Sequence, residues 1–269
     1  MRGRARAIGL LLGVATLLPA SSAAAGLADR VGATFALMAA DFIKAFQPLE
    51  GIVVDVAADL IYLDLGEAVG AQVGQEFTVF RKGNVFTHPL TGKPLGRYEE
   101  VLGWAQVRRV LARFSEAAFV PAPGKPAPRA EDGVRITRGR IKVAITPVLD
   151  LTRSKADVRR VPYLFATVLE RSKRFQVIDP LAVTDMFANG SVRVEEMLAR
   201  PERATRAARN LEVAGWLVPV LIERRGVTYL DATWISAVTG TALFSRRQPI
   251  LAAEATEEQR FPWEPRVED

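Results

Sequence analysis

The chain has 269 residues, of which 49% are hydrophobic and 25% are charged, and its formal net charge is +6. This composition is typical of a globular protein with room for two domains, and it argues against a disordered or fibrous chain. The chain has no cysteine and one histidine. These counts exclude disulfides, thiol chemistry and the common histidine- and cysteine-based zinc sites, and no metal or cofactor is expected.

Residues 1–25 have the pattern of a secretory signal peptide. Three arginines precede a short apolar run over residues 8–18, and three alanines at 23–25 offer a cleavage site. The run is shorter than the ~20 apolar residues of a transmembrane helix, although a retained membrane anchor is the alternative. No cysteine follows the run, so the sequence predicts no lipid anchor.

The charge of the remaining chain gives no case for a nucleic-acid partner. Residues 1–25 carry three arginines and no acids, so without them 33 basic residues face 30 acidic ones, a formal charge of +3. Proteins that bind nucleic acid usually show a concentrated basic face instead. The sequence predicts an exported, periplasmic protein, free or associated with the outer membrane, and peripheral to the membrane at most.

The first part after the signal segment, residues 26–50, contains a predicted amphipathic helix. Between residues 27 and 47 apolar side chains recur every three or four positions, which is the spacing of one helical face. Two interpretations are open: the stripe faces the protein's own core, or it docks on a partner or on a second copy. The anchors of such a docking helix would be Phe35, Phe42 and Phe46.

Residues 51–138 are predicted to form a small β-barrel or β-sandwich domain. Several short stretches of period-two alternation are separated by glycine-containing connections, with little helical pattern between them. Lys82-Gly83-Asn84 is a hairpin signal between two of these stretches. Strands are expected at 52–56, 60–65, 76–81, 103–111, 116–120 and 134–137.

The stretch NVFTHPLTGKPLGRYEE, residues 84–100, is predicted to be an ordered arm between two strands. Its Thr-Gly-Lys triplet lacks the earlier glycine and the following serine or threonine of a phosphate-binding loop. Two prolines and two glycines fix its shape, with a β-turn at PLTG. Loops held on a rigid sheet are common recognition surfaces, and a plain ordered hairpin is the alternative. The candidate partner-binding residues are His88, Lys93, Arg97 and Tyr98.

Residues 139–251 are predicted to form an α/β sandwich, with helices on one face of a mixed sheet that ends in an antiparallel meander. The predicted fold class of the whole chain is therefore α+β. Residues 252–269 hold six acids and two arginines and are predicted to be an acidic flexible tail. Strands are expected at 141–149, 175–179, 215–223, 227–237 and 241–249, and helices at 162–174, 181–188, 194–199 and 202–213.

No set of residues points to a catalytic site. The strongest candidates are Asp150 and Asp179, which follow predicted strands at the edge where α/β ligand sites gather. Glycan hydrolases commonly use a pair of carboxylates as catalytic residues. Their other interpretation is structural, because Asp179 precedes Pro180 as a helix N-cap does and Asp150 precedes a turn.

Two parts of the sequence resemble known families. LIYLDLGEAVGAQVGQEFTVFRKG followed by HPLTGKPLG resembles the C-terminal β-domain of flagellar assembly protein T, a periplasmic protein associated with a ring around the motor's rod. IKVAITPVLDLT, LERSKRFQVIDP, LVPVLIE and VTGTALF are similar to the α/β domain shared by that protein's middle region, the TolB N-terminal domain and curli secretion components. In this chain the β-domain comes first, and a single helix precedes it.

The resemblance implies a periplasmic scaffold or assembly factor. The predicted function is a non-enzymatic scaffold of a cell-envelope complex, flagellar-ring-like or secretion-associated, whose partners are envelope proteins or a second copy. The alternatives are a periplasmic carboxylate-dependent glycan hydrolase and a ligand-sensing envelope module.

Overall fold

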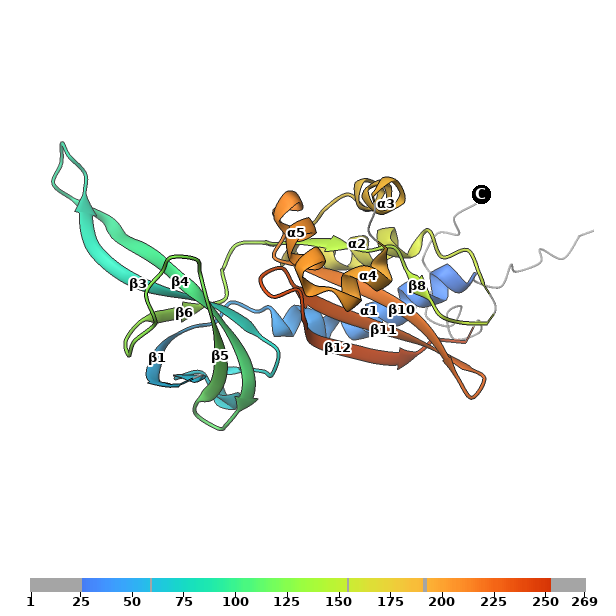
Figure 1. Cartoon of the computed structure of the whole chain (residues 1–269), viewed down its shortest axis with the longest axis horizontal. Helices are drawn as coiled ribbons and strands as arrows, with labels where there is room; N and C mark the ends of the chain where they lie inside the picture. The colour runs from blue at the N-terminus through green and yellow to red at the C-terminus, as the bar shows by residue number, and fades with distance from the viewer. Residues whose placement is uncertain (1–25, 59, 154, 191–192, 253–269) are drawn as a thin grey trace, which may run out of the picture.

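The computed structural model describes residues 26–58, 60–153, 155–190 and 193–252, and its fold is α+β, as predicted. A closed barrel of six strands lies beside a mixed sheet of six strands, on which the helices pack (Figure 1). The predicted signal peptide and all but the first residue of the predicted acidic tail lie outside the described residues. No helix in the described ranges is both long enough and apolar enough to span a membrane.

The barrel has the strand order β1-β2-β5-β4-β3-β6. Alternate side chains point inward and fill it, for example Phe77 and Val79 of one strand and Ala105 and Val107 of its neighbour. The predicted strands of this region are all present. They are β1 (Glu50–Ala57), β2 (Leu60–Leu63), β3 (Glu76–Thr87), β4 (Pro94–Val110), β5 (Ser115–Pro121) and β6 (Gly133–Arg135), with a short helix η1 (Glu67–Val69) after β2.

One turn of the barrel was predicted wrongly. Lys82-Gly83-Asn84 is not a hairpin turn, because β3 continues through it with a register shift between Lys82 and Val85. The chain reverses instead at PLTG, where the amide of His88 donates to the carbonyl of Lys93 at 2.8 Å and the amide of Gly92 donates to the carbonyl of His88 at 2.9 Å. A glycine can be accommodated within a strand by a β-bulge. A triplet that contains glycine, such as Lys82-Gly83-Asn84, therefore does not by itself fix the position of a turn.

The second sheet has the order β12-β11-β10-β7-β9, and β8 pairs with β10 beside this path. β7 runs parallel to β9 and β10, and the last three strands form the predicted antiparallel meander. The strands are β7 (Ile141–Ile145), β8 (Leu149–Asp150), β9 (Phe175–Val177), β10 (Gly215–Arg224), β11 (Val227–Ser236) and β12 (Ala242–Pro249).

Helices cover both faces of this sheet, which corrects the prediction of helices on one face. α1 (Leu27–Ala45) and α2 (Val161–Arg171) pack on one face, and α3 (Pro180–Asn189), α4 (Val194–Ala199) and α5 (Pro201–Leu211) pack on the other. Side chains of β10 alternate between the two cores: Trp216 and Val218 enter the second, Leu217 and Leu221 the first. The nearly continuous apolar run of β10 is typical of a strand buried on both faces.

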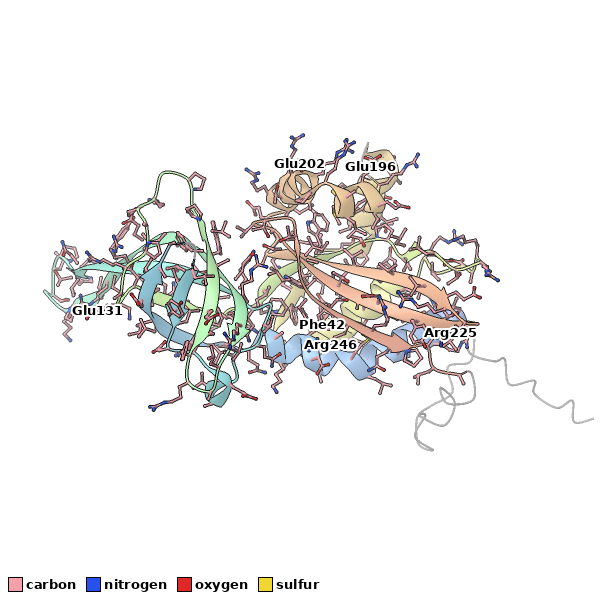
Figure 2. The ribbon with its side chains drawn as sticks, turned by 60° about the horizontal axis from the view of Figure 1, so that its bottom comes forward. Phe42, Glu131, Glu196, Glu202, Arg225 and Arg246 are labelled. Carbon is pink, nitrogen blue, oxygen red and sulfur yellow. The ribbon has the colours of Figure 1, made fainter. Side chains whose placement is uncertain are left out.

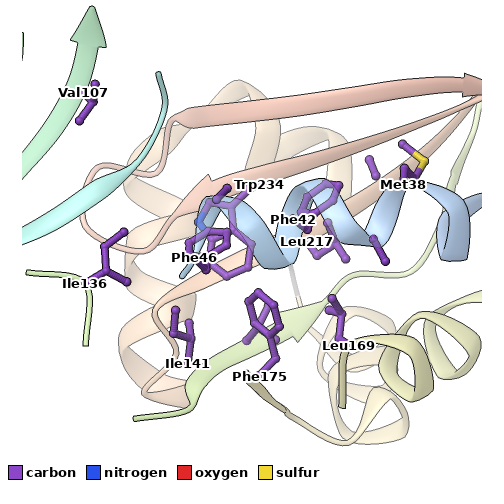
Figure 3. Close-up of a cluster of buried hydrophobic side chains, with 14 of the residues drawn as sticks. Met38, Phe42, Phe46, Val107, Ile136, Ile141, Leu169, Phe175, Leu217 and Trp234 are labelled. Atoms are coloured by element: carbon purple, nitrogen blue, oxygen red, sulfur yellow. The ribbon is translucent and has the colours of Figure 1, made fainter. Parts of the chain in front are cut away.

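The aromatic stripe of α1 belongs to the first of these cores (Figure 3). Phe35, Phe42 and Phe46 are 0%, 1% and 8% exposed. Phe35 stacks on the ring of Phe165 with centroids 3.8 Å apart, and Phe46 lies 4.3 Å from the ring of Trp234. The core-facing interpretation of the helix is confirmed, and in this structure these three rings are not available as surface anchors.

α1 is also fixed to the outer strand of the sheet. Phe42 faces Phe244 of β12 with ring centroids 4.4 Å apart. Beside it, Nε of Arg246 donates to the carboxylate of Asp41 at 2.9 Å (Figure 2). The helix that precedes the barrel in sequence therefore packs on strands that follow the barrel.

Arg174, just before β9, joins the two connections between the barrel and the sheet. Its side chain is mostly buried, and its guanidinium donates to the carbonyls of Phe46, Thr137 and Gly139, the last two at 2.5 Å. Burial lowers the pKa of this guanidinium from its ordinary value. The three carbonyls take the place of a carboxylate partner, so the charge is solvated by backbone dipoles.

The barrel also meets the sheet through a buried carboxylate, Glu76 of β3. One oxygen of Glu76 accepts from Nε2 of Gln106 at 2.8 Å and from the hydroxyl of Ser236 at 2.7 Å, and Gln106 donates as well to Thr239 at 3.1 Å. Burial raises the pKa of Glu76 above its ordinary value of 4.5, although both hydrogen bonds act to lower it. The ionised form is thus disfavoured at the junction.

Replacement of Phe42 by alanine should cost about 3–5 kcal/mol of unfolding free energy, because it opens a cavity between α1 and β12. Urea unfolding followed by tryptophan fluorescence measures this loss. The matched control is Leu37→Ala on the same helix, where the side chain is 59% exposed and the change should stay within about 0.5 kcal/mol. Equal losses in the two variants would contradict the burial of the stripe.

The variant Glu76→Gln should become more stable relative to the native chain as pH rises. Below about pH 4.5 Glu76 is protonated in both the folded and the unfolded state. Above that pH the unfolded state releases its proton first, because the folded pKa is raised, and the native chain loses stability until pH passes the folded pKa. The amide does not titrate and escapes this loss.

Thermal unfolding between pH 4 and pH 8 measures the difference between the two proteins. The exposed Glu67→Gln serves as the control for a carboxylate removed elsewhere on the barrel. A stability difference for Glu76→Gln that stays flat or falls with pH would contradict the buried, disfavoured carboxylate.

Candidate functional site

The candidate site is the part of the β3–β4 hairpin that extends beyond the barrel. β3 pairs with β6 only as far as Phe80, and β4 pairs with β5 only from Gly103 onward. Residues 82–98, called the arm below, therefore form a ribbon of two strands and a turn. Figure 1 shows the arm projecting from the barrel, away from the sheet and its helices.

Ion pairs fix the arm where it leaves the barrel. Arg81 binds both carboxylate oxygens of Asp132, at 2.8 and 2.7 Å, and this contact raises the pKa of Arg81. On the other strand, Glu99 pairs with Arg135 at 2.6 Å and Glu100 pairs with Lys125 at 3.1 Å. The direction of the ribbon is thus set at its base by contacts with β6 and with the segment before it.

Beyond this base, the arm presents large apolar side chains to solvent. An isolated two-stranded ribbon has no third layer to cover it, and such exposure is unusual for a monomeric surface. The exposed fractions are 46% for Val85, 52% for Phe86, 89% for Leu90, 59% for Leu95 and 66% for Tyr98.

The two aromatic rings of the arm lie over glycines of the opposite strand. A Cβ on Gly96 would meet the ring of Phe86 at 3.7 Å, and one on Gly83 would meet the side chain of Tyr98 at 3.5 Å. The register pairs Val85 with Arg97, so these two share the other side of the ribbon. One side of the arm is therefore aromatic, and the other is aliphatic and basic.

The charge of the arm has one sign. Residues 82–98 contain Lys82, Lys93 and Arg97 and no acidic residue. Within the described ranges none of these three side chains is in an ion pair. The arm therefore offers free positive charge next to exposed apolar surface.

The structure brings four of the predicted binding residues together on the arm. Lys93, Arg97 and Tyr98 are exposed there. His88 has a structural role in the turn, since its Nδ1 accepts from the amides of Leu90 and Thr91 at 3.2 and 3.3 Å. That these residues bind a partner stays a prediction.

Sequence reasoning missed the apolar members of the arm. Val85, Phe86, Leu90 and Leu95 were not among the candidates, because apolar residues next to a turn are ordinarily explained by burial in the sheet. The available signal was the length of the stretch, since seventeen residues are too many for a tight turn between barrel strands.

The carboxylates proposed for catalysis have structural roles. Oδ1 of Asp179 accepts from the amide of Leu181 at 2.9 Å and caps α3, which confirms the N-cap interpretation. Oδ1 of Asp150 accepts from the amide and the hydroxyl of Thr152 at 2.9 and 2.7 Å. In the described ranges no three histidine, cysteine, aspartate or glutamate residues gather as a metal site would require.

Asp150 and Asp179 line neither of two surface cavities found in the described part of the chain. One, of about 310 Å³, lies along the two connections between barrel and sheet, at residues 48–50 and 135–139. The other, of about 330 Å³, lies between α3 and α5 and is lined by Met186, Phe187, Gly190, Arg203, Arg206, Ala207 and Asn210.

The chain matches no protein-family model and no curated protein. Several solved structures are similar to part of it. The LpoB C-terminal domain from Escherichia coli is 12% identical, with a TM-score of 0.36, over 43% of this chain and 86% of that one; the domain from Salmonella enterica gives the same values. Lipoprotein GNA1162 from Neisseria meningitidis is 18% identical, with a TM-score of 0.35, over 41% of this chain and 79% of that one.

At TM-scores this low, the likeness carries no argument about what the chain does. It does correct one expectation. The absence of a cysteine after the apolar run led us to expect no lipid anchor, but the similar structure from Neisseria meningitidis is titled a lipoprotein. We therefore withdraw the expectation that an anchor is absent.

Proposed function

We propose that this chain is a non-enzymatic scaffold or assembly factor of the bacterial cell envelope that binds envelope proteins through the arm. The proposed location is the periplasm, free or associated with the outer membrane, as the pattern of residues 1–25 predicts.

The observation that carries the proposal is the arm. Its base is held by ion pairs, while Leu90, Leu95 and Tyr98 beyond it are more than half exposed. Exposed apolar side chains beside unpaired strand edges are costly to keep in a soluble protein, because they invite association. Exposed apolar side chains on a projecting arm are therefore best explained by binding of a partner to the arm.

The resemblance of residues 60–83 and 88–96 to the β-domain of flagellar assembly protein T supports a finer form of the proposal. In that form the envelope complex is flagellar-ring-like or secretion-associated. The second of these stretches covers the turn of the arm, with Leu90, Lys93 and Leu95 of the proposed binding surface.

We do not propose the two alternative functions. The glycan hydrolase hypothesis rested on Asp150 and Asp179. Both carboxylates are engaged in local hydrogen bonds, and they line neither of the cavities described above. The ligand-sensing hypothesis rested on the α/β region as a whole, and no contact among the described residues of that region points to a ligand.

A photo-crosslinking amino acid at position 90, in place of the 89%-exposed Leu90, should capture envelope proteins in living cells. The turn of the arm is the part that reaches furthest from the barrel, so a bound partner lies within reach of it. Adducts are resolved by gel shift and identified by mass spectrometry.

The matched control is the same amino acid in place of Leu181 on α3, which is 53% exposed and lies outside the arm. Envelope proteins captured at position 90 and not at position 181 support the arm as the binding surface. Capture at neither position, or equally at both, contradicts it.

A further inference from the structure

We propose that the arm of one copy binds the acidic segment of a second copy, residues 253–269, so that copies join head to tail. This inference rests on the proposed role of the arm as a binding surface and names one occupant for it.

The arm offers two unpaired strand edges to an extended peptide. In the described part of the chain, β3 beyond Arg81 and β4 before Leu102 have no third strand beside them. An extended segment can add to such an edge through backbone hydrogen bonds, while its side chains contact the faces of the ribbon. The aromatic face of Phe86 and Tyr98 suits a segment that carries its own aromatic residues.

The charge and composition of residues 253–269 match the arm. The segment holds six acidic residues and two arginines, while the arm holds three basic residues and no acid. The segment also contains Phe261 and Trp263, which can pack on the aromatic face of the arm. Opposite charges steer the encounter and set its direction.

The same charges argue against pairing between two arms. An arm–arm contact would bring two sets of Lys82, Lys93 and Arg97 together without an acidic residue between them. Like charges directly opposite each other destabilise a strand pair. The contact is therefore heterologous: the arm of one copy meets a different surface of the next.

The position where the acidic segment begins favours a second copy over the same molecule. The amide of Leu251 donates to the hydroxyl of Thr34 at 3.1 Å, so the chain lies beside the first half of α1 just before this segment begins. β12 runs away from the barrel toward this point, while the arm projects beyond the barrel's other side (Figure 1). Within one molecule the segment would have to pass the second half of α1 and the whole barrel.

The full chain, produced with its first 25 residues so that it is exported, is measured by size-exclusion chromatography with light scattering over a range of concentrations. We expect the mass to rise with concentration and to fall back to that of one copy when salt is raised, because the contact depends on charge. Two variants, Lys93→Glu with Arg97→Glu and a deletion of residues 253–269, should each stay at the mass of one copy.

Mixing the two variants tests the head-to-tail geometry. The arm variant keeps a working acidic segment, and the deletion variant keeps a working arm, so together they should form a pair of twice the single mass and nothing larger. Unchanged thermal unfolding of both variants checks that the charge reversals and the deletion leave the fold intact, as is usual for exposed sites.

Two outcomes would overturn the inference. One is a full chain of single mass at every concentration, and the other is association of the deletion variant with itself. In the first case, binding of a peptide of residues 253–269 by the deletion variant would mean that the segment reaches the arm of its own molecule. If either outcome occurs while position 90 still captures envelope proteins, the proposed function stands and this inference alone falls.

Discussion

The burial of α1 against the sheet is the contact on which the rest of the structure depends. The helix precedes the barrel in sequence, and it packs on α2, β11 and β12, which all follow the barrel. The barrel is therefore inserted between the first helix of the α/β unit and the remainder of that unit. Two connections rather than one join it to the sheet, and Arg174 binds carbonyls of both, at Phe46 on one side and at Thr137 and Gly139 on the other.

This arrangement explains why a small barrel can hold a long unsupported ribbon in a defined direction. At the side facing the sheet, Glu76 and Gln106 join β3 and β4 to Ser236 and Thr239. At the other side, the pair of Arg81 with Asp132 fixes the same β3 where the arm begins. The two strands of the arm are thus continuous with strands that are anchored in the junction. The part of β3 between Glu76 and Arg81 is fixed at both ends, by the contacts with Ser236 at one end and with Asp132 at the other. Any movement of the arm therefore begins beyond Arg81.

Much of the fold follows from the spacing of apolar residues and from the residues that form turns and caps. β10 was expected at 215–223 and lies at Gly215–Arg224, and the Asp179-Pro180 cap begins α3 as predicted. The partner of an apolar face is not a local property, however. The spacing of Phe35, Phe42 and Phe46 shows that α1 has an apolar stripe, but it does not show that strands some two hundred residues later cover it. For the same reason the helices were predicted on one face of the sheet.

The candidate site was predicted in part. The prolines and glycines of residues 84–100 indicated an ordered arm, and Lys93, Arg97 and Tyr98 are exposed on it. The exposure of Leu90 and Leu95 could not be predicted, because it results from the ends of β6 and β5, which stop short of the ribbon. The exposure of a side chain in a sheet depends on how far the neighbouring strands extend. In this protein the length of those strands is set by the closure of the barrel.

The double connection of the barrel has a mechanical consequence. A force applied at the tip of the arm and directed along its strands loads the pairing of β3 with β6 and of β4 with β5 in shear. From the barrel it divides between two covalent paths that enter the same body, one through α1 and one through β7. A bound partner that is pulled or rotated would therefore transmit its motion to the whole molecule, with no hinge at a single linker to absorb it.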